Sequence, residues 1–134
     1  MNAEAVKNAV LYLALAALLL VGWSNVLAAP ESDYRDKWCE ARNGQVEVRL
    51  ADGTRVDCVT KFYAVEVDFS RKWAEAVGQA LWYAANTGRV AKIVLIVDFT
   101  SNTSVAQYER VRKLIWHYEL PIDLEAVDVT FVNQ

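Results

Sequence analysis

The sequence predicts an α/β fold in which a mixed sheet is flanked by helices. Residues 45–60 alternate polar and apolar side chains on either side of an Asp-Gly turn, which is typical of a β-hairpin. Residues 92–97, with the sequence KIVLIV, are mostly branched and apolar, as in a strand that is buried on both faces. Helical segments precede and follow this run, so we expect the antiparallel hairpin to be joined to a βαβ-like second half.

The N-terminal residues predict an export signal. Residues 9–23 form an apolar run without a charge, which has the length and character of the central region of a signal peptide. Val26 and Ala28 occupy the positions that a signal peptidase reads before its cut, and Pro30 prevents a helix from continuing. We expect cleavage after Ala28, which makes residues 1–28 a signal peptide.

Cleavage would place the mature protein in the periplasm or outside the cell, as a single domain over residues 29–134. A chain of that length can bury one hydrophobic core but not two. After cleavage no membrane contact is expected. The alternative is an uncleaved membrane anchor over residues 9–29, because this stretch approaches the roughly 20 apolar residues that cross a bilayer.

The charge of the chain bears on its partners. The formal net charge is −3, so the protein has no overall positive field that would attract nucleic acid or an anionic membrane. A polyanionic partner would therefore have to be held locally. The cations of the second half that could do so are Arg71, Lys72, Arg89, Lys92, Arg110, Arg112 and Lys113.

The two cysteines predict a disulfide. Cys39 and Cys58 are the only cysteines, and an even number in an exported chain favours a bridge. Closing this loop of about 20 residues would contribute roughly 3 kcal/mol to stability in the chain-entropy model. Two buried free thiols are the alternative. Together with the single histidine, His117, the cysteines do not reach the usual ligand count of a zinc site.

A helix and three strands are expected in the first half of the mature chain. Ser32 or Asp33 can cap a helix that ends at Asn43-Gly44, because both of these last residues tolerate a left-handed backbone. The hairpin over residues 45–60 follows. Residues 63–69, with the sequence YAVEVDF, are then expected to form a third strand of the meander.

Helices alternate with strands in the second half. Ser70 is expected to cap a helix that stops before Gly88, since glycine readily adopts the left-handed conformation. Polar residues 101–104 can cap a further helix, which ends ahead of Pro121. The expected elements are, in order, a helix over residues 71–86, a strand over 92–97, a helix over 105–118 and a strand over 126–132.

Three acidic side chains converge in this arrangement. Glu66 and Asp68 are two residues apart on the third strand, so both leave the same face, while Val65 and Val67 face the other way. Antiparallel pairing brings Asp57, on the preceding strand, to about the same level. Clustered carboxylates raise one another's pKa unless a cation such as Mg²⁺ or Mn²⁺ neutralises them. The alternative is an ordinary solvated sheet face.

The helix that follows this strand carries a polar stripe. At about 100° per residue, Lys72, Gln79 and Tyr83 lie on one side of the helix, offset from its apolar stripe. The helix could therefore direct an amine, an amide and a phenol towards the carboxylates. The alternative is that these are ordinary polar residues of a helix surface.

The order of elements and acids matches a pattern that is known from one group of enzymes. The chain has the order α-β-β-β-α-β, with Asp57 on the second strand, Glu66-Val67-Asp68 on the third, and Gln79 and Tyr83 in a Q-x-x-x-Y helix. Together these features resemble the PD-(D/E)XK nuclease superfamily, over about residues 32–100. The resemblance implies a restriction-endonuclease-like α-β-β-β-α-β-α-β core with a central mixed sheet.

The resemblance also implies roles for individual residues. Asp57 and Glu66 would be the ligands of a Mg²⁺ or Mn²⁺ ion. Gln79 and Tyr83 would support the substrate or the site. Glu40 occupies a place comparable to that of an acid on the first helix, which often joins such sites.

The chain departs from the family at one position of the motif. Asp68 stands where the family has a lysine, and Lys72, on the same helix face as Gln79, is the candidate replacement, with Arg71 as the second choice. The resemblance then implies metal-dependent hydrolysis of phosphodiester bonds in nucleic acid. The alternative is a nuclease-like fold without catalysis that serves as a binding or interaction module. The expected catalytic residues are Asp57, Glu66, Asp68 and Lys72.

Overall fold

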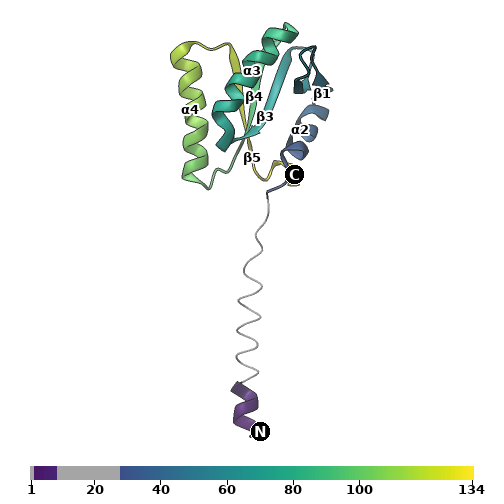
Figure 1. The fold of residues 1–134 in the computed structure, drawn as a ribbon. Coiled ribbons are helices and arrows are strands. Elements are labelled where there is room, and N and C mark those ends of the chain that lie inside the picture. The colour runs from purple at the N-terminus through teal and green to yellow at the C-terminus, as the bar shows by residue number, and fades with distance from the viewer. Residues whose placement is uncertain (1, 9–27) are drawn as a thin grey trace.

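The fold is taken from a computed structural model in which residues 2–8 and 28–134 are described (Figure 1). The predicted signal peptide over residues 1–28 and the alternative anchor over residues 9–29 fall mostly outside these described residues. Within residues 2–8 and 28–134, every helix falls short of the length and apolar character needed to cross a bilayer.

Five strands form one mixed sheet in the order β1-β2-β3-β4-β5. β1 pairs with β2 and β2 with β3 in antiparallel fashion, whereas β3 pairs with β4 and β4 with β5 in parallel. The α/β class with a mixed sheet is thereby confirmed. The strands are β1 (Gln45–Arg49), β2 (Arg55–Val59), β3 (Tyr63–Phe69), β4 (Val90–Val97) and β5 (Ile122–Asp128).

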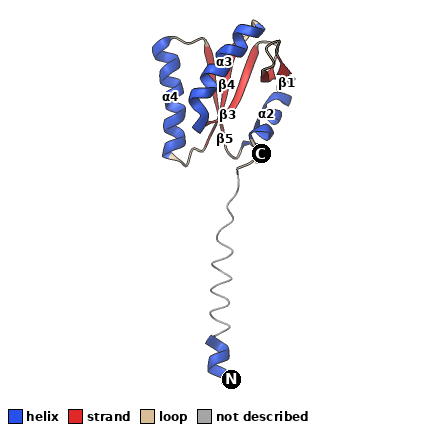
Figure 2. Cartoon of the chain, viewed as in Figure 1, coloured by secondary structure: helices blue, strands red, loops and turns tan. Residues whose placement is uncertain are grey.

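Helices cover both faces of the sheet (Figures 1 and 2). Trp38 of the first domain helix packs in one core with Val67 of β3. Ala80 and Val111, from the two later helices, pack in a second core with Leu95 of β4. The sheet is therefore a middle layer between α2 on one face and α3 with α4 on the other. The helices are α2 (Glu31–Glu40), α3 (Trp73–Thr87) and α4 (Asn102–Tyr118).

The acids of β3 face α3, and the valines face α2. Glu66 and Asp68 lie in register with Ile93 and Leu95 of β4, which belong to the core under α3 and α4. Val67 belongs to the core under α2. The predicted separation of carboxylates from valines is confirmed, and it places two acids on the inner side of a helix rather than on a solvated face.

β4 is an interior strand that is buried on both faces, as the apolar run predicts, but the last strand lies earlier than expected. β5 spans Ile122–Asp128, not residues 126–132. Its pairing with β4 starts at Ala91 and ends at Val97, so there is no strand for later residues to pair with. Thr130 instead hydrogen-bonds to the side chain of Asp128 at 2.6 Å in a turn.

Two predicted helix caps are replaced by other arrangements. α2 begins at Glu31 with Pro30 in the cap position and no side-chain cap, so Ser32 and Asp33 lie inside the first turn. Pro30 has a φ of −61°, which is within the range that the proline ring fixes. Ser70 begins a 3-10 turn (Ser70–Lys72) ahead of α3, and its hydroxyl lies 2.7 Å from that of Ser104 in the first turn of α4.

Other predicted helix ends are confirmed. Gly88 follows α3 with a φ of 66°, the left-handed conformation that glycine adopts without steric cost. The hydroxyl of Ser101 accepts a hydrogen bond from the main-chain N–H of Ser104 and caps α4, although the helix starts at Asn102, earlier than expected.

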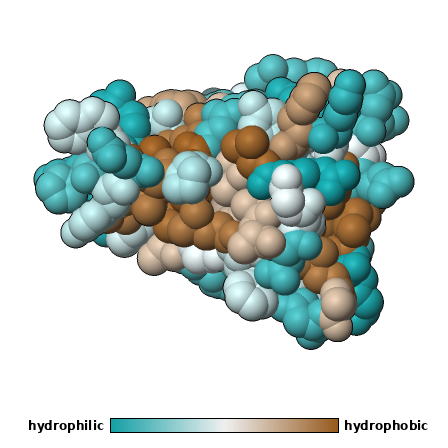
Figure 3. Space-filling model, turned by 90° about the horizontal axis from the view of Figure 1, so that it is seen from above, coloured by the Kyte–Doolittle hydropathy of each residue, from teal (hydrophilic) through white to brown (hydrophobic). Residues whose placement is uncertain are grey.

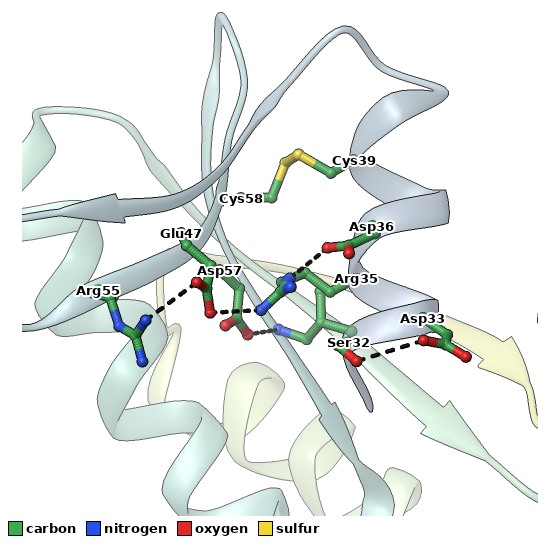
Figure 4. A network of polar contacts seen from close by, with 10 residues as sticks. Ser32, Asp33, Arg35, Asp36, Cys39, Glu47, Arg55, Asp57 and Cys58 are labelled. Carbon is green, nitrogen blue, oxygen red and sulfur yellow. Dashed lines mark hydrogen bonds and ion pairs between the residues drawn. A yellow bond between two sulfur atoms is a disulfide. The ribbon is translucent and has the colours of Figure 1, made fainter. Parts of the chain in front are cut away.

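The predicted disulfide joins α2 to β2. Cys39 and Cys58 are bridged, with their Cα atoms 5.8 Å apart (Figure 4). Gly44 packs directly on the bridge, since a Cβ at this position would lie 2.5 Å from Sγ of Cys58 and 2.6 Å from Sγ of Cys39. The turn after α2 therefore needs a residue without a side chain, for reasons of space rather than of backbone angle.

Several large hydrophobic side chains remain exposed on the domain. Figure 3, seen from above, shows hydrophobic surface across the middle of this face with hydrophilic side chains around it. Single exposed apolar residues are normal in folded proteins, so they are informative only where they line a concave site. Those of residues 28–134 are Val46, Phe62, Trp82, Val90, Phe99, Trp116 and Tyr118.

Candidate active site

A polar cleft of about 160 Å³ lies between the start of α2, the β1–β2 hairpin, β3 and α3. Six of its residues are predicted site residues, so the sequence-based cluster is largely assembled. These are Asp57, Glu66, Asp68, Lys72, Gln79 and Tyr83. The remaining lining residues, which the sequence did not single out, are Glu31, Glu47, Arg55 and Glu75.

Asp57 lies where β2 and β3 separate. The two strands pair at Cys58 with Val65 and at Val59 with Ala64, but not beyond. The main-chain N–H of Val67, which has no partner on β2, donates a 2.8 Å hydrogen bond to Oδ2 of Asp57. The carboxylate thus occupies the gap between the strands and is oriented by the strand that carries Glu66.

The backbone of β1 is also irregular, at the residue opposite Asp57. The register on either side places Glu47 opposite Asp57, and Glu47 has a φ of 52°, which is uncommon for a residue with a side chain. Arg35 of α2 lies 2.8 Å from one carboxylate oxygen of Glu47, and Arg55 lies 3.1 Å from the other (Figure 4). Glu47 and Arg55 of this ion-pair network line the cleft beside Asp57. Burial raises the pKa of Asp57, and the charge of Arg35 offsets part of that rise.

Glu66 is a buried acid of the cleft that has an unpartnered oxygen. The residue is 4 % exposed, and its Oε2 has no hydrogen-bond partner. Burial raises the pKa of Glu66 to about 10, with further contributions from the charges of Asp57 and Asp68. A carboxyl group in this position holds a proton at neutral pH unless a cation replaces that proton.

The pKa values of Asp57 and Asp68 are also raised. Burial raises the pKa of Asp57 to about 6, and the N–H of Val67 opposes the rise. Burial raises the pKa of Asp68 to about 7, and Lys72 opposes that rise. Three neighbouring acids thus share an environment that disfavours their simultaneous ionisation.

Lys72 lines the cleft, although it lies in the 3-10 turn before α3 and not within the helix as expected. Its Nζ lies 3.2 Å from Oδ1 of Asp68 and 3.3 Å from Oε2 of Glu31. Burial lowers the pKa of Lys72, but the hydrogen bonds and charges of these two acids raise it by more. Arg71, the second choice for this role, lies instead over the ring of Phe69, 4.4 Å from its centroid, and does not line the cleft.

Gln79 and Tyr83 form the wall of the cleft on α3. They are one helical turn apart, and Nε2 of Gln79 lies 3.5 Å from the hydroxyl of Tyr83, to which it donates a hydrogen bond. Oε1 of Gln79 is buried without a partner. Burial and the charges of Glu66 and Asp57 raise the pKa of Tyr83 to about 12, so the phenol stays protonated.

The first helix contributes a different acid from the predicted one. Glu40 is exposed and does not line the cleft, whereas Glu31 does. Glu40 therefore lies apart from the cleft that contains the other predicted residues. Glu40 is the last residue of α2, next to Cys39, whose disulfide joins that end of the helix to β2. The cleft instead contacts the first residue of α2, Glu31. To choose Glu31 over Glu40 from the sequence, one would need to know how α2 crosses the sheet, and no local pattern indicates that direction.

Two carboxylates of the cleft are the residues that could contribute to a metal site. In the described part of the chain, no group of three or more His, Cys, Asp and Glu side chains is arranged to hold a metal ion. Mg²⁺ commonly takes only one or two carboxylates and keeps several waters. Asp57 and the unpartnered Oε2 of Glu66 could provide such a pair.

Comparison with known protein families, curated proteins and solved structures finds no match to this chain.

Proposed function

We propose that this protein is an exported, metal-dependent hydrolase of phosphodiester bonds. The observation that carries the proposal is the buried Oε2 of Glu66, which lies without a partner in a cleft that also contains Asp57 and Asp68. An acid that is buried at this cost is expected to serve a ligand, and perturbed carboxylates in a cleft are typical of functional sites.

Asp57 and Glu66 would hold a Mg²⁺ or Mn²⁺ ion. Such an ion supplies Lewis acidity, which favours attack on a phosphodiester. Asp68 keeps the ammonium of Lys72 at 3.2 Å, beside the carboxylates, where it can stabilise negative charge that develops on a phosphate. Gln79 and Tyr83 would orient the substrate or a water through their amide and phenol groups.

The arrangement of the strands supports a restriction-endonuclease-like core. An antiparallel meander, β1 to β3, is followed by α3 and by β4 parallel to β3. Asp57 on β2 and Glu66 on β3 meet at the point where these strands separate. The Q-x-x-x-Y helix packs over the same place. We therefore propose a distant relationship to the PD-(D/E)XK superfamily.

A second candidate is a binding module without catalysis. Asp68 replaces the lysine of the family motif, and Lys72 is paired with two carboxylates. The acids that line the cleft also outnumber its cations, which opposes the approach of a polyanion. Under this alternative the fold is retained, and the cleft serves a partner or a metal ion alone.

Export is part of the proposal, and the disulfide supports it, because such bridges persist in oxidising compartments. The mass of the protein from its native host tests this point. A mature chain that begins near Ala29 is expected, and a mass that includes the first 28 residues would support the anchor instead.

The experiment that tests catalysis combines calorimetry with a cleavage assay on the oxidised mature protein. We expect uptake of Mn²⁺ and Mn²⁺-dependent cleavage of plasmid or single-stranded DNA. Asp57→Asn and Glu66→Gln should lose both. Glu40→Gln is the matched control, because it neutralises an acid of α2 outside the cleft, and it should retain both.

Lys72→Met separates the two candidates further. The hydrolase proposal predicts that this variant loses cleavage by more than about tenfold but still takes up metal. Arg71→Met, which removes a neighbouring cation outside the cleft, should behave like the wild type. Metal uptake by the wild type without cleavage would favour the binding module, and absence of uptake would overturn the metal site.

A further inference from the structure

A second concave site lies on the α2 face of the sheet and shares no residue with the cleft. It encloses about 240 Å³ at the end of the sheet where β3 and β4 begin. We call it the basic pocket. Its lining residues are Trp38, Arg42, Thr60, Lys61, Phe62, Tyr63 and Lys92.

Two cations of the basic pocket are held in place by acids of β5. Lys92 is largely buried, and its Nζ lies 2.9 Å from Asp123 and 3.1 Å from Glu125. Arg42 lies 3.2 Å from Glu125, and its guanidinium stacks 3.9 Å from the ring centroid of Trp38. These cations are therefore positioned by the fold rather than free to move in solvent.

Further positive charge gathers at the turn between β2 and β3. Lys61 is exposed at the mouth of the pocket, with its ammonium 5.2 Å from the ring centroid of Phe62. Arg89 donates a 2.8 Å hydrogen bond from Nε to the carbonyl of Thr60 and so lies beside the same turn. In a chain with a net charge of −3, this is a local concentration of cations.

Aromatic side chains line the pocket together with the cations. Phe62 is 63 % exposed on the turn, although a phenylalanine ring gains free energy when it is covered. Tyr63 and Trp38 lie deeper, and Lys92 lies 5.1 Å from the ring centroid of Tyr63. An exposed ring beside several cations suits a ligand that has both a flat unsaturated face and negative charge.

We propose that the basic pocket binds single-stranded nucleic acid, with a base against Phe62 and backbone phosphates at Lys61 and Arg42. The choice of this ligand rests on the proposed function, which requires a polynucleotide substrate although the acids of the cleft repel a polyanion. A single strand suits the pocket because its bases are free to stack, whereas the bases of a duplex are not. The pocket would supply the attraction that the cleft lacks.

Fluorescence anisotropy of labelled oligo(dT) in the presence of EDTA tests the pocket without catalysis. We expect Phe62→Ala and Lys61→Glu each to weaken binding by about tenfold, since stacking and phosphate contacts both contribute. Lys61→Glu should also reduce the dependence of binding on salt. The turn is exposed, so neither change should unfold the protein, and circular dichroism checks this.

Two matched variants on α4 serve as controls. Trp116, which is 80 % exposed, and Lys113 offer an aromatic and a cation outside the pocket. Trp116→Ala and Lys113→Glu should bind the strand as the wild type does. If these variants lose affinity while Phe62→Ala and Lys61→Glu do not, or if the wild type does not bind in EDTA, the inference is overturned.

Cleavage in the presence of Mn²⁺ tests the proposed function separately. A wild-type protein that binds through the pocket but never cleaves would overturn the catalytic proposal and support the pocket. A wild-type protein that cleaves, with equal strand affinity in Phe62→Ala and Lys61→Glu, would overturn the pocket and support the catalytic proposal.

Discussion

The carboxylate of Asp57 accepts a 2.8 Å hydrogen bond from the main-chain N–H of Val67, at the point where β2 and β3 stop pairing. A side chain thus takes the place of a strand carbonyl. This one contact links the acid on β2 to the strand that carries Glu66 and Asp68, so the position of Asp57 depends on the pairing defect beside it. The contact makes Asp57 both a site residue and a structural one.

Replacement of Asp57 should separate these two roles. Asp57→Ala leaves the N–H of Val67 without its acceptor, at a cost of about 1–3 kcal/mol. Asp57→Asn keeps an acceptor oxygen and should lose less stability, although both changes remove the charge. Urea denaturation of the two variants measures the difference, and equal stabilities would show that the hydrogen bond does not support the fold.

The acids of the cleft predict a stability that falls as the pH rises. Glu66, Asp68 and Asp57 have pKa values near 10, 7 and 6 in the folded protein, all above their ordinary values. The folded state then binds more protons than the unfolded state, so the free energy of unfolding decreases above about pH 4. The loss of stability that Asp57 and Asp68 cause is complete near pH 6 and pH 7, their pKa values in the folded protein. The loss that Glu66 causes continues to about pH 10.

Urea denaturation in EDTA, from about pH 4 to about pH 10, tests whether stability falls as the pH rises. Glu66→Gln removes the acid with the largest shift, so its stability should fall less steeply than that of the wild type. Added Mn²⁺ should raise the stability of the wild type at neutral pH, because a ligand that binds the folded state alone stabilises it. A wild-type stability that rises from acidic to neutral pH would contradict the raised pKa values.

The disulfide should affect both stability and the cleft. Cys39 and Cys58 are 19 residues apart, and the double variant Cys39→Ser/Cys58→Ser should lose roughly 3 kcal/mol. Because Cys58 directly follows Asp57, we also expect weaker uptake of Mn²⁺ without the bridge. On this hypothesis the protein becomes competent only after oxidation outside the cytoplasm. Unchanged metal affinity in a folded double variant would refute it.

Gly44 offers an independent test of the packing around this bridge. An alanine here would place its Cβ within 2.6 Å of both sulfur atoms, so Gly44→Ala should destabilise the protein by about 1–3 kcal/mol. Gly78, on α3, has nothing within 4 Å of such a Cβ. Gly78→Ala should therefore stabilise the protein by up to about 1 kcal/mol, as in other helices. Thermal unfolding of the two variants compares them directly.

Local periodicity was enough to predict much of the site. The period of two along β3 separates Glu66 and Asp68 from the buried valines, and the period of α3 places Gln79 and Tyr83 on one side of the helix. Both patterns depend only on how a backbone repeats, so they can be read from neighbouring residues. The same holds for the hairpin, for the buried strand β4 and for Gly88 at the end of α3.

Non-local contacts decided the rest. The choice of Glu31 over Glu40 depends on how α2 crosses the sheet, and the bounds of β5 depend on where its parallel partner β4 ends. Glu47 lies beside Asp57 because the backbone of β1 is irregular at that residue. Arg35 reaches Glu47 because α2 packs next to the strand. The sequence by itself determined which faces carry the acids, the amide and the amine. Only the tertiary structure decided which of these faces meet, because that depends on contacts between residues far apart in the chain.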